Sequence, residues 1–218
     1  MNVRNVITFL TLLFLPVLAF AADDATAARV ELISGNIGLI KLVIFLIGFI
    51  LFVSGGYKLA LISEEGNKVG KSVPLVYIIV GTILMNVTLA IGIFGNTYFK
   101  AGDFCFVVSD NAINNACMNT EVSGLTGEMK ARIEKLSSGS TAEKFMENIQ
   151  MIIGIFQIIG LIYFSVGAYG IAQVANGSSK DGGYGKPIIT MFASALIVDI
   201  PHTAMMAIET LEKIGINF

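Results

Sequence analysis

FLIGFILFVSGGYKLALI, residues 45–62, and QIIGLIYFSVGAYGIAQV, residues 157–174, carry one pattern of apolar, glycine and tyrosine positions, 112 residues apart. Each stretch is followed by a short loop, a Gly-Lys pair, a proline and a further apolar run. Repetition at such a distance indicates two copies of one structural unit. Identities at the fixed offset include Gly48 and Gly160, Phe52 and Phe164, Gly55 and Gly167, Tyr57 and Tyr169, and Ala60 and Ala172.

Each copy contains two apolar runs that are long enough for a membrane helix, which needs about 20 residues. Loops rich in turn-forming residues, SEEGNKVGK and NGSSKDGGYGK, join the two runs of each copy. The sequence therefore predicts an all-α integral membrane protein made of two repeated helical hairpins. The four predicted transmembrane helices are Ile37–Ile62, Val73–Tyr98, Ile149–Ala175 and Pro187–Ile208.

The first 21 residues have the pattern of a cleavable signal peptide. Arg4 precedes an apolar segment, and Ala19-Phe20-Ala21 places small residues at the −3 and −1 positions of a cleavage site after Ala21. The alternative is an uncleaved anchor helix. The predicted organisation is a signal peptide at 1–21, a first hairpin at 22–99, a periplasmic loop at 100–140 and a second hairpin at 141–218.

A cleaved signal peptide predicts a bacterial inner-membrane protein whose mature N-terminus is periplasmic. Both hairpin loops then face the cytoplasm, and the C-terminus and residues 100–148 face the periplasm. Lysines in or beside the hairpin loops agree with the positive-inside rule. These lysines are Lys58, Lys68, Lys71, Lys180 and Lys186.

The two cysteines, Cys105 and Cys117, both belong to the predicted periplasmic loop. Because the periplasm is oxidising, we expect a disulfide between them. On the chain-entropy model such a short closed loop is worth about 3 kcal/mol. The alternative is a pair of free thiols. A metal site is disfavoured, since the single histidine, His202, lies in the last predicted span.

Three polar residues interrupt the predicted spans. Asp199 and His202 lie three positions apart around Pro201, so both can face one side of a kinked helix. Ionisable residues at membrane depth indicate either a proton relay or a polar contact between helices. Asn86 occupies the place of Asp199 in the first copy, which favours the packing interpretation.

The composition indicates which partners to expect. Apolar residues make up 55% of the chain and charged residues 14%, against about 25% in soluble domains. Most of the surface is therefore expected to contact the lipid bilayer or other membrane helices. The net charge of −2 offers no basic field, so direct nucleic-acid binding is not expected. No catalytic, cofactor or metal site is predicted, and we do not expect an enzyme.

Glycines mark the predicted helix contacts. Gly48 and Gly55 are seven residues apart, which places both on one helix face, and Gly160 and Gly167 repeat that spacing. Small residues on one face let helix backbones approach closely in lipid. The contacts can lie within the hairpins or between subunits, and the abundance of small residues favours homo- or hetero-oligomeric assembly.

Three features together resemble a known family: the signal peptide, Gly48…Gly55-Gly56-Tyr57-Lys58, and the Gly-Lys turns before Pro74 and Pro187. They resemble the small inner-membrane proteins of type IVB secretion and IncI-type conjugation systems, in particular the IcmC/DotE/TraQ group. IcmD/DotP corresponds to one hairpin. The resemblance covers most of the mature chain except the loop from about residue 100 to 140. It implies a component of an envelope-spanning machine that moves DNA or protein effectors, together with other secretion-system membrane proteins, and it supplies no catalytic residue.

Two further interpretations stay open. VirB-type pilins also combine a signal peptide with two apolar helices and a basic cytoplasmic loop, so the chain is also similar to a double-length pilin-like subunit that polymerises into a conjugative tube. The second open interpretation is a small two-repeat transporter, with Asn86, Asp199 and His202 near its midplane.

Overall fold

The computed structural model describes residues 25–64, 72–99, 106–109, 112–113, 139–178 and 183–215. This part of the chain is helical except for one antiparallel pair of short strands, in which Val108 pairs with Ile113. The predicted signal peptide lies outside the described residues. The elements are α2 (Ala25–Glu64), α3 (Ser72–Met85), α4 (Val87–Phe99), β1 (Val108–Ser109), β2 (Ala112–Ile113), α7 (Gly139–Ala175), α8 (Gly185–Val198) and α9 (Ile200–Lys213).

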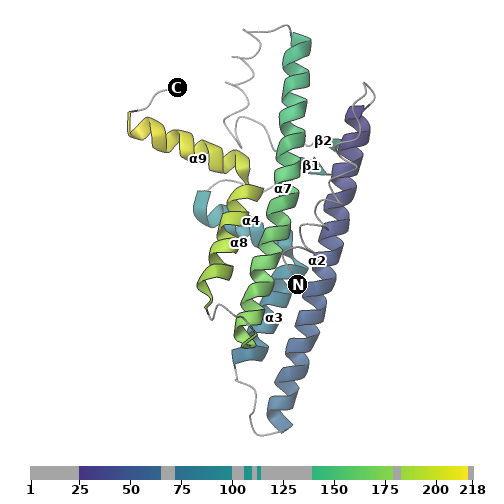
Figure 1. Cartoon of the computed structure of the whole chain (residues 1–218), viewed down its shortest axis with the longest axis vertical. Coiled ribbons are helices and arrows are strands. Elements are labelled where there is room, and N and C mark those ends of the chain that lie inside the picture. The colour runs from purple at the N-terminus through teal and green to yellow at the C-terminus, as the bar shows by residue number, and fades with distance from the viewer. Residues whose placement is uncertain are drawn as a thin grey trace.

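Two helices dominate the molecule (Figure 1). Helix α2 has 40 residues and α7 has 37. At 1.5 Å per residue they are about 60 and 55 Å long, nearly twice the hydrocarbon thickness of a bilayer. Their segments Ala28–Ile62 and Glu147–Ala175 are long and apolar enough to cross a membrane. They confirm that the first and third predicted spans are helices long and apolar enough to cross a membrane, and both helices begin earlier than we predicted.

The second and fourth predicted spans are not continuous helices. Helices α3 and α4 meet at Asn86 with a bend of 93°, and together they are long and apolar enough for a third, broken span or for a re-entrant loop. Helix α8 has 14 residues, roughly 21 Å, and ends at Asp199 before α9 begins. The second break has a cause in the sequence, because Pro201, in the first turn of α9, has no N–H to donate to a helix that continued through it. The first break contains no proline.

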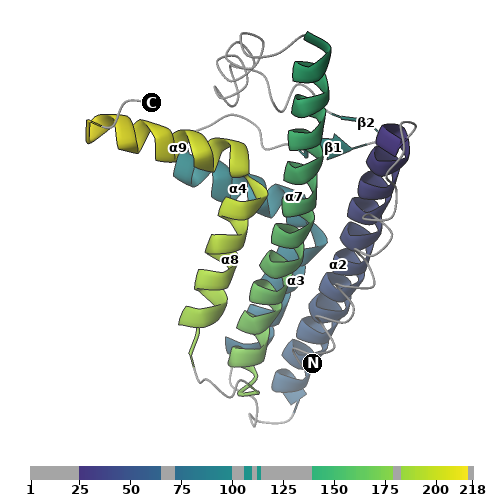
Figure 2. The ribbon, with the colours of Figure 1, turned by 45° about the horizontal axis from the view of Figure 1, so that its top comes forward.

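The helices form two antiparallel pairs that run in the same direction (Figures 1 and 2). Hairpin one consists of α2, α3 and α4, and hairpin two of α7, α8 and α9. Helix α3 packs along α2, and α8 packs along α7. Both α4 and α9 turn away sideways near the same end of the bundle, and α9 projects beyond it (Figure 2).

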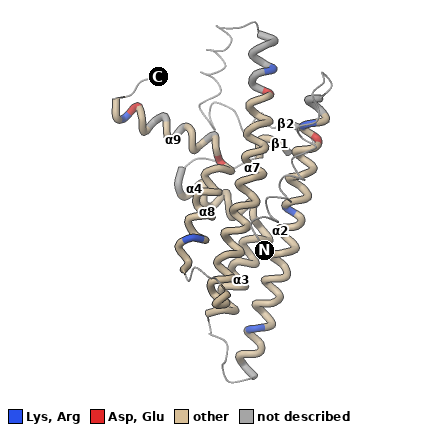
Figure 3. Tube along the Cα trace, viewed as in Figure 1, with Lys and Arg blue, Asp and Glu red and all other residues tan. Residues whose placement is uncertain are grey.

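A single apolar core joins the hairpins. Helix α7 contacts both α3 and α2, while α4 contacts α8 and α9. The rings of Phe94 and Phe164 meet edge to face, with their centroids 5.6 Å apart. Leu84, Ile91 and Leu161 are almost completely buried beside them. Charged residues are sparse along the described helices (Figure 3), and many large apolar side chains are exposed, which suits a surface in contact with lipid.

Candidate functional site

Hairpin one closes at two glycines of α2. A methyl group added at Gly48 would lie 2.7 Å from the backbone nitrogen of Met85 and 2.8 Å from the carbonyl oxygen of Gly81. One added at Gly55 would lie 2.9 Å from the backbone nitrogen of Ile78 and 3.0 Å from the carbonyl oxygen of Pro74. These neighbours are backbone atoms that cannot rotate away. Only glycine therefore allows the two helices to approach so closely.

Hairpin two closes in the same way at the two repeat-related glycines. Gly160 faces the carbonyl oxygen of Ser194 and the backbone nitrogen of Val198, each 3.0 Å from an added methyl group. Gly167 faces the carbonyl oxygen of Pro187 and the backbone nitrogen of Met191, each at 2.9 Å. All four glycines thus lie at contacts within the hairpins. The α8 partners each follow their α3 counterparts by 113 positions: Pro74 and Pro187, Ile78 and Met191, Gly81 and Ser194, and Met85 and Val198.

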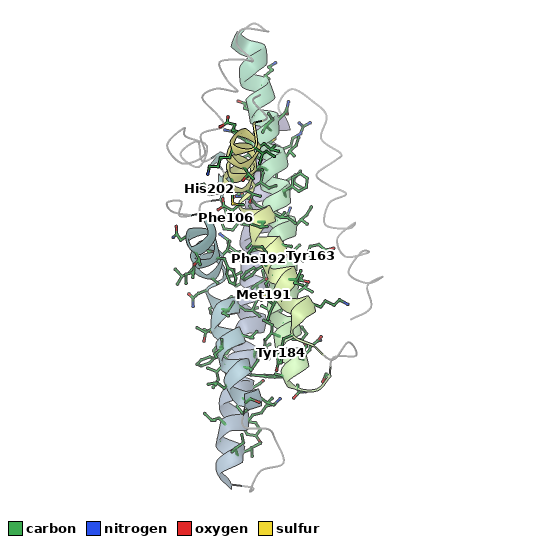
Figure 4. All side chains as sticks on the ribbon, turned by 90° about the vertical axis from the view of Figure 1, so that its left-hand side faces the viewer. Phe106, Tyr163, Tyr184, Met191, Phe192 and His202 are labelled. Atoms are coloured by element: carbon green, nitrogen blue, oxygen red, sulfur yellow. The ribbon has the colours of Figure 1, made fainter. Side chains whose placement is uncertain are left out.

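The break between α8 and α9 at Asp199, here called elbow two, is polar and enclosed. His202 Nδ1 and Asp199 Oδ1 are 2.7 Å apart, and both side chains are 8% exposed. The other carboxylate oxygen, Oδ2, lies 3.2 Å from a methyl group placed at Gly95, so α4 covers the pair. Figure 4 shows His202 beyond the C-terminal end of α8, with Met191 within that helix and Tyr184 just before its first residue, at the other end.

Two residues that sequence reasoning missed complete elbow two. The fully buried Gln157 of α7 donates from Nε2 to the carbonyl oxygen of Val198 at 3.2 Å. Its Oε1 accepts the backbone N–H of Val107 at 2.9 Å. Thr203 Oγ1 lies 2.8 Å from the carbonyl oxygen of Leu196, to which it donates. A helix end leaves carbonyl groups without helical donors, and a buried carbonyl needs a partner. The available signal was one glutamine within the apolar run of residues 151–164.

The break between α3 and α4 at Asn86, here called elbow one, has an equivalent pair of backbone hydrogen bonds but different surroundings. The Asn86 N–H donates to the carbonyl oxygen of Thr82, and the Ala90 N–H donates to that of Asn86. In elbow two, the Asp199 N–H donates to Ala195 and the Thr203 N–H to Asp199 in the same way. Asn86 itself is exposed. The repeat counterparts of Gln157, His202 and Thr203 are Phe45, Leu89 and Ala90. Elbow one opens onto a groove of about 840 Å³, whose lining includes Lys41, Phe45, Asn86, Leu89 and Asn96.

Only some of the lysines predicted in or beside the hairpin loops lie among the described residues. Lys58 lies within α2, not in the loop, and donates from Nζ to Asn176 Oδ1 at 2.9 Å while resting 3.9 Å from the Tyr77 ring centroid. Lys186 lies exposed in the first turn of α8. Lys41 rests over the Phe106 ring, 3.8 Å from its centroid. Lys68, Lys71, Lys180, Cys105 and Cys117 lie outside the described residues.

These features define a helical membrane protein, with two helices that can span a bilayer, or three if the bent α3–α4 pair counts as one span. Within the described ranges, no three His, Cys, Asp or Glu side chains are placed to hold a metal ion. Comparisons with protein-family models, with curated proteins and with solved structures found no match to this chain.

Proposed function

We propose that this chain is a small integral membrane subunit of a type IV, IVB-like secretion or conjugation apparatus. It acts by assembly with itself or with other membrane proteins of the machine, and not by catalytic turnover. The observation that carries the proposal is the glycine contact set, because the same close backbone approach is built twice in one chain. The polar residues of elbow two are engaged in holding a helix break. The hairpin motifs that resemble the IcmC/DotE/TraQ group supply the kind of machine.

The proposed topology places four helical segments in the inner membrane, with the signal peptide removed and the hairpin loops in the cytoplasm. Helices α3 and α8 rise about 21 Å from those loops, so both elbows fall in the periplasmic third of a hydrocarbon layer about 30 Å thick. Helices α4 and α9 then lie along the periplasmic surface. Glu212 and Lys213 of α9 are exposed, as a surface helix requires.

Fusions and thiol labelling test this topology. Mature protein should begin at Ala22, and alkaline phosphatase should be active when fused near Asn115 and inactive when fused near Asn67. Cys105 and Cys117 should resist a maleimide after denaturation until a reductant is added. Activity at Asn67 with silence at Asn115 would reverse the orientation, and full labelling without reductant would show free thiols.

Gene deletion tests the function itself. Loss of the chain should abolish transfer of a mobilisable plasmid or of a protein effector by the host's secretion apparatus, and expression in trans should restore it. The tagged chain should migrate in native gels as part of a complex much larger than one subunit. Normal transfer in the deletion strain would remove the proposal. A stacked tube of this chain alone would instead identify the pilin-like form of the same function.

A small two-repeat transporter is the second candidate, favoured by the buried Asp199–His202 pair. The two candidates separate by substitution. A transporter that moves protons through the pair fails when Asp199→Asn or His202→Gln removes the ionisable group. An assembling subunit tolerates both changes, because the new side chains still form hydrogen bonds.

A further inference from the structure

One face of α7 is fully buried: it meets hairpin one at Phe164, and at Gln157 it meets Val107 and Val198. Gln157, Leu161, Phe164 and Ala168 follow one another along this face, and none of the four is exposed to solvent. Helices α3 and α2 pack on α7, and Phe94 of α4 meets Phe164. The face is thus the joint between the two hairpins of one chain.

The repeat counterpart of that face on α2 is open. Leu42, Phe45, Phe49 and Phe52, here called the α2 stripe, occupy the positions of Gly154, Gln157, Leu161 and Phe164. Their exposed fractions are 58%, 42%, 49% and 42%. Because the hairpins close through the same glycine contacts, the two faces point in equivalent directions. Among the described residues, hairpin one therefore lacks the neighbour that hairpin two has.

The matching surface is open on the other side of the molecule. On α3, Val80 is 1% exposed, within the core that hairpin one forms with α7. Its counterpart on α8, Ala193, is exposed, and so is Ile189, the counterpart of Val76. Helix α4 of hairpin one covers hairpin two, whereas its counterpart α9 projects from the bundle (Figure 1). Hairpin one contacts hairpin two through α3 and α4. The equivalent surface of hairpin two, on α8 and α9, is exposed.

We propose that the α2 stripe of one chain binds the outer face of α8 and α9 of a second copy, repeating between chains the joint between hairpins within a chain. Such a contact joins two different faces, so it closes a ring or grows a helical array. The inference deepens the proposed function and rests on it only in assuming assembly. Contact with lipid alone would account for an exposed apolar stripe. It would not explain why the α2 stripe and the outer face of α8 and α9, the repeat counterparts of the two surfaces that meet within the chain, are both exposed.

The repeat fixes the register of this contact. The Phe94–Phe164 pair within the chain corresponds to Ala207 of α9 and Phe52 of the α2 stripe. Ala207 is exposed on the projecting helix. Ala207 of one copy should therefore lie beside Phe52 of the next. The groove at elbow one, lined by Phe45 and Asn86, lies beside the same stripe and would be covered by the incoming α9.

Cross-linking in membranes tests this register. Cells express two differently tagged chains in a Cys105→Ser, Cys117→Ser background, one with Phe52→Cys and the other with Ala207→Cys, and a short bifunctional methanethiosulfonate is added. We expect covalent dimers carrying both tags, and a ladder when one chain carries both substitutions. Ile50→Cys replaces Phe52→Cys in the matched control, because Ile50 is 63% exposed but lies off the stripe. Its yield with Ala207→Cys should be at least fivefold lower.

Two further measurements keep the test decisive. Phe94→Cys with Phe164→Cys should cross-link within one chain and shows that the reagent reaches the packed helices. A photoreactive phenylalanine analogue at position 52 of the chain with its own cysteines should yield a peptide of α8 or α9, which removes any dependence on the cysteine-free background. Symmetric Phe52–Phe52 products, photoproducts with lipid or another protein only, or no product beside a working Phe94–Phe164 control would overturn the inference.

The outcome is separable from that of the proposed function. Cross-links in register, in a strain whose transfer survives deletion of the gene, would leave the joint standing and remove the secretion role. If transfer needs the chain but the photoproduct at position 52 comes only from a different protein, the secretion role stands and the proposed contact between copies is wrong.

Discussion

Elbow one and elbow two occupy the same position in the two hairpins, yet their surroundings differ. Each breaks a helix at a polar residue, Asn86 or Asp199, with the same pair of backbone hydrogen bonds around it. Elbow two is closed by Gln157, His202 and Thr203 from inside the chain. Elbow one has apolar counterparts at these positions and opens onto a groove.

The difference shows how one backbone can serve two environments. Backbone groups released by a helix break within a bilayer need hydrogen-bond partners, and burial in protein makes side chains the available donors. Elbow two is covered by α4, so it has to provide its own donors. Within the described ranges, elbow one opens onto the groove and Asn86 is exposed, so other molecules can reach it. The polar side chains of elbow two are therefore explained by its burial under α4, and the helix break alone does not require them.

The largest expected effect comes from replacing the glycines at which both hairpins close. Gly55→Leu and Gly167→Leu should each destabilise the protein by about 1–3 kcal/mol or more, because the new side chain meets backbone atoms of α3 or α8. Thermal unfolding in detergent and the size of the native complex measure the effect. Gly56→Leu is the matched control, since nothing lies within 4 Å of a methyl group at Gly56. Unequal effects at Gly55 and Gly167 would break the equivalence of the two hairpins.

A smaller, one-sided effect separates the two elbows. Gln157→Leu leaves the buried Val107 N–H and Val198 carbonyl without their side-chain partner, at about 1–3 kcal/mol for each group. Phe45→Leu at the counterpart position should change the stability of the isolated chain by about 0.5 kcal/mol or less, because Phe45 is exposed. Denaturant unfolding of the detergent-solubilised chain compares the two. Equal losses would show that elbow one is closed as tightly as elbow two.

The smallest effect is expected from changes that keep hydrogen bonding and remove charge. Asp199→Asn and His202→Gln should each cost less than about 1.5 kcal/mol, because amide groups can rebuild the 2.7 Å contact. Plasmid transfer and native complex size should stay near those of the unmodified chain, as should those of Asn86→Ala at elbow one. Loss of function in both charge variants, with both glycine replacements tolerated, would favour the transporter.

Part of this architecture was predictable from the sequence. Long apolar runs predicted the segments of α2 and α7 that can span a membrane, and Pro201 indicated a kink near Asp199. The break at Asn86 was not predicted, because one asparagine without proline does not distinguish a bent helix from a straight one. Gln157 was also missed. Its importance depends on the carbonyl of Val198, 41 residues away, and on Val107 in a segment whose course the pattern does not specify.

The contact between Lys58 and Asn176 has a mechanical consequence. It links α2 to the end of α7 at the loop end of the bundle, while core packing joins the hairpins nearer the elbows, so the two hairpins of one chain are held together at both ends as one block. The repeat counterparts of these two residues are Gly170 and Glu64, and glycine has no side chain with which to reproduce the link. An array built through the α2 stripe would therefore alternate stiff joints within chains with compliant joints between them. Such a chain of blocks can change its curvature without unfolding any subunit.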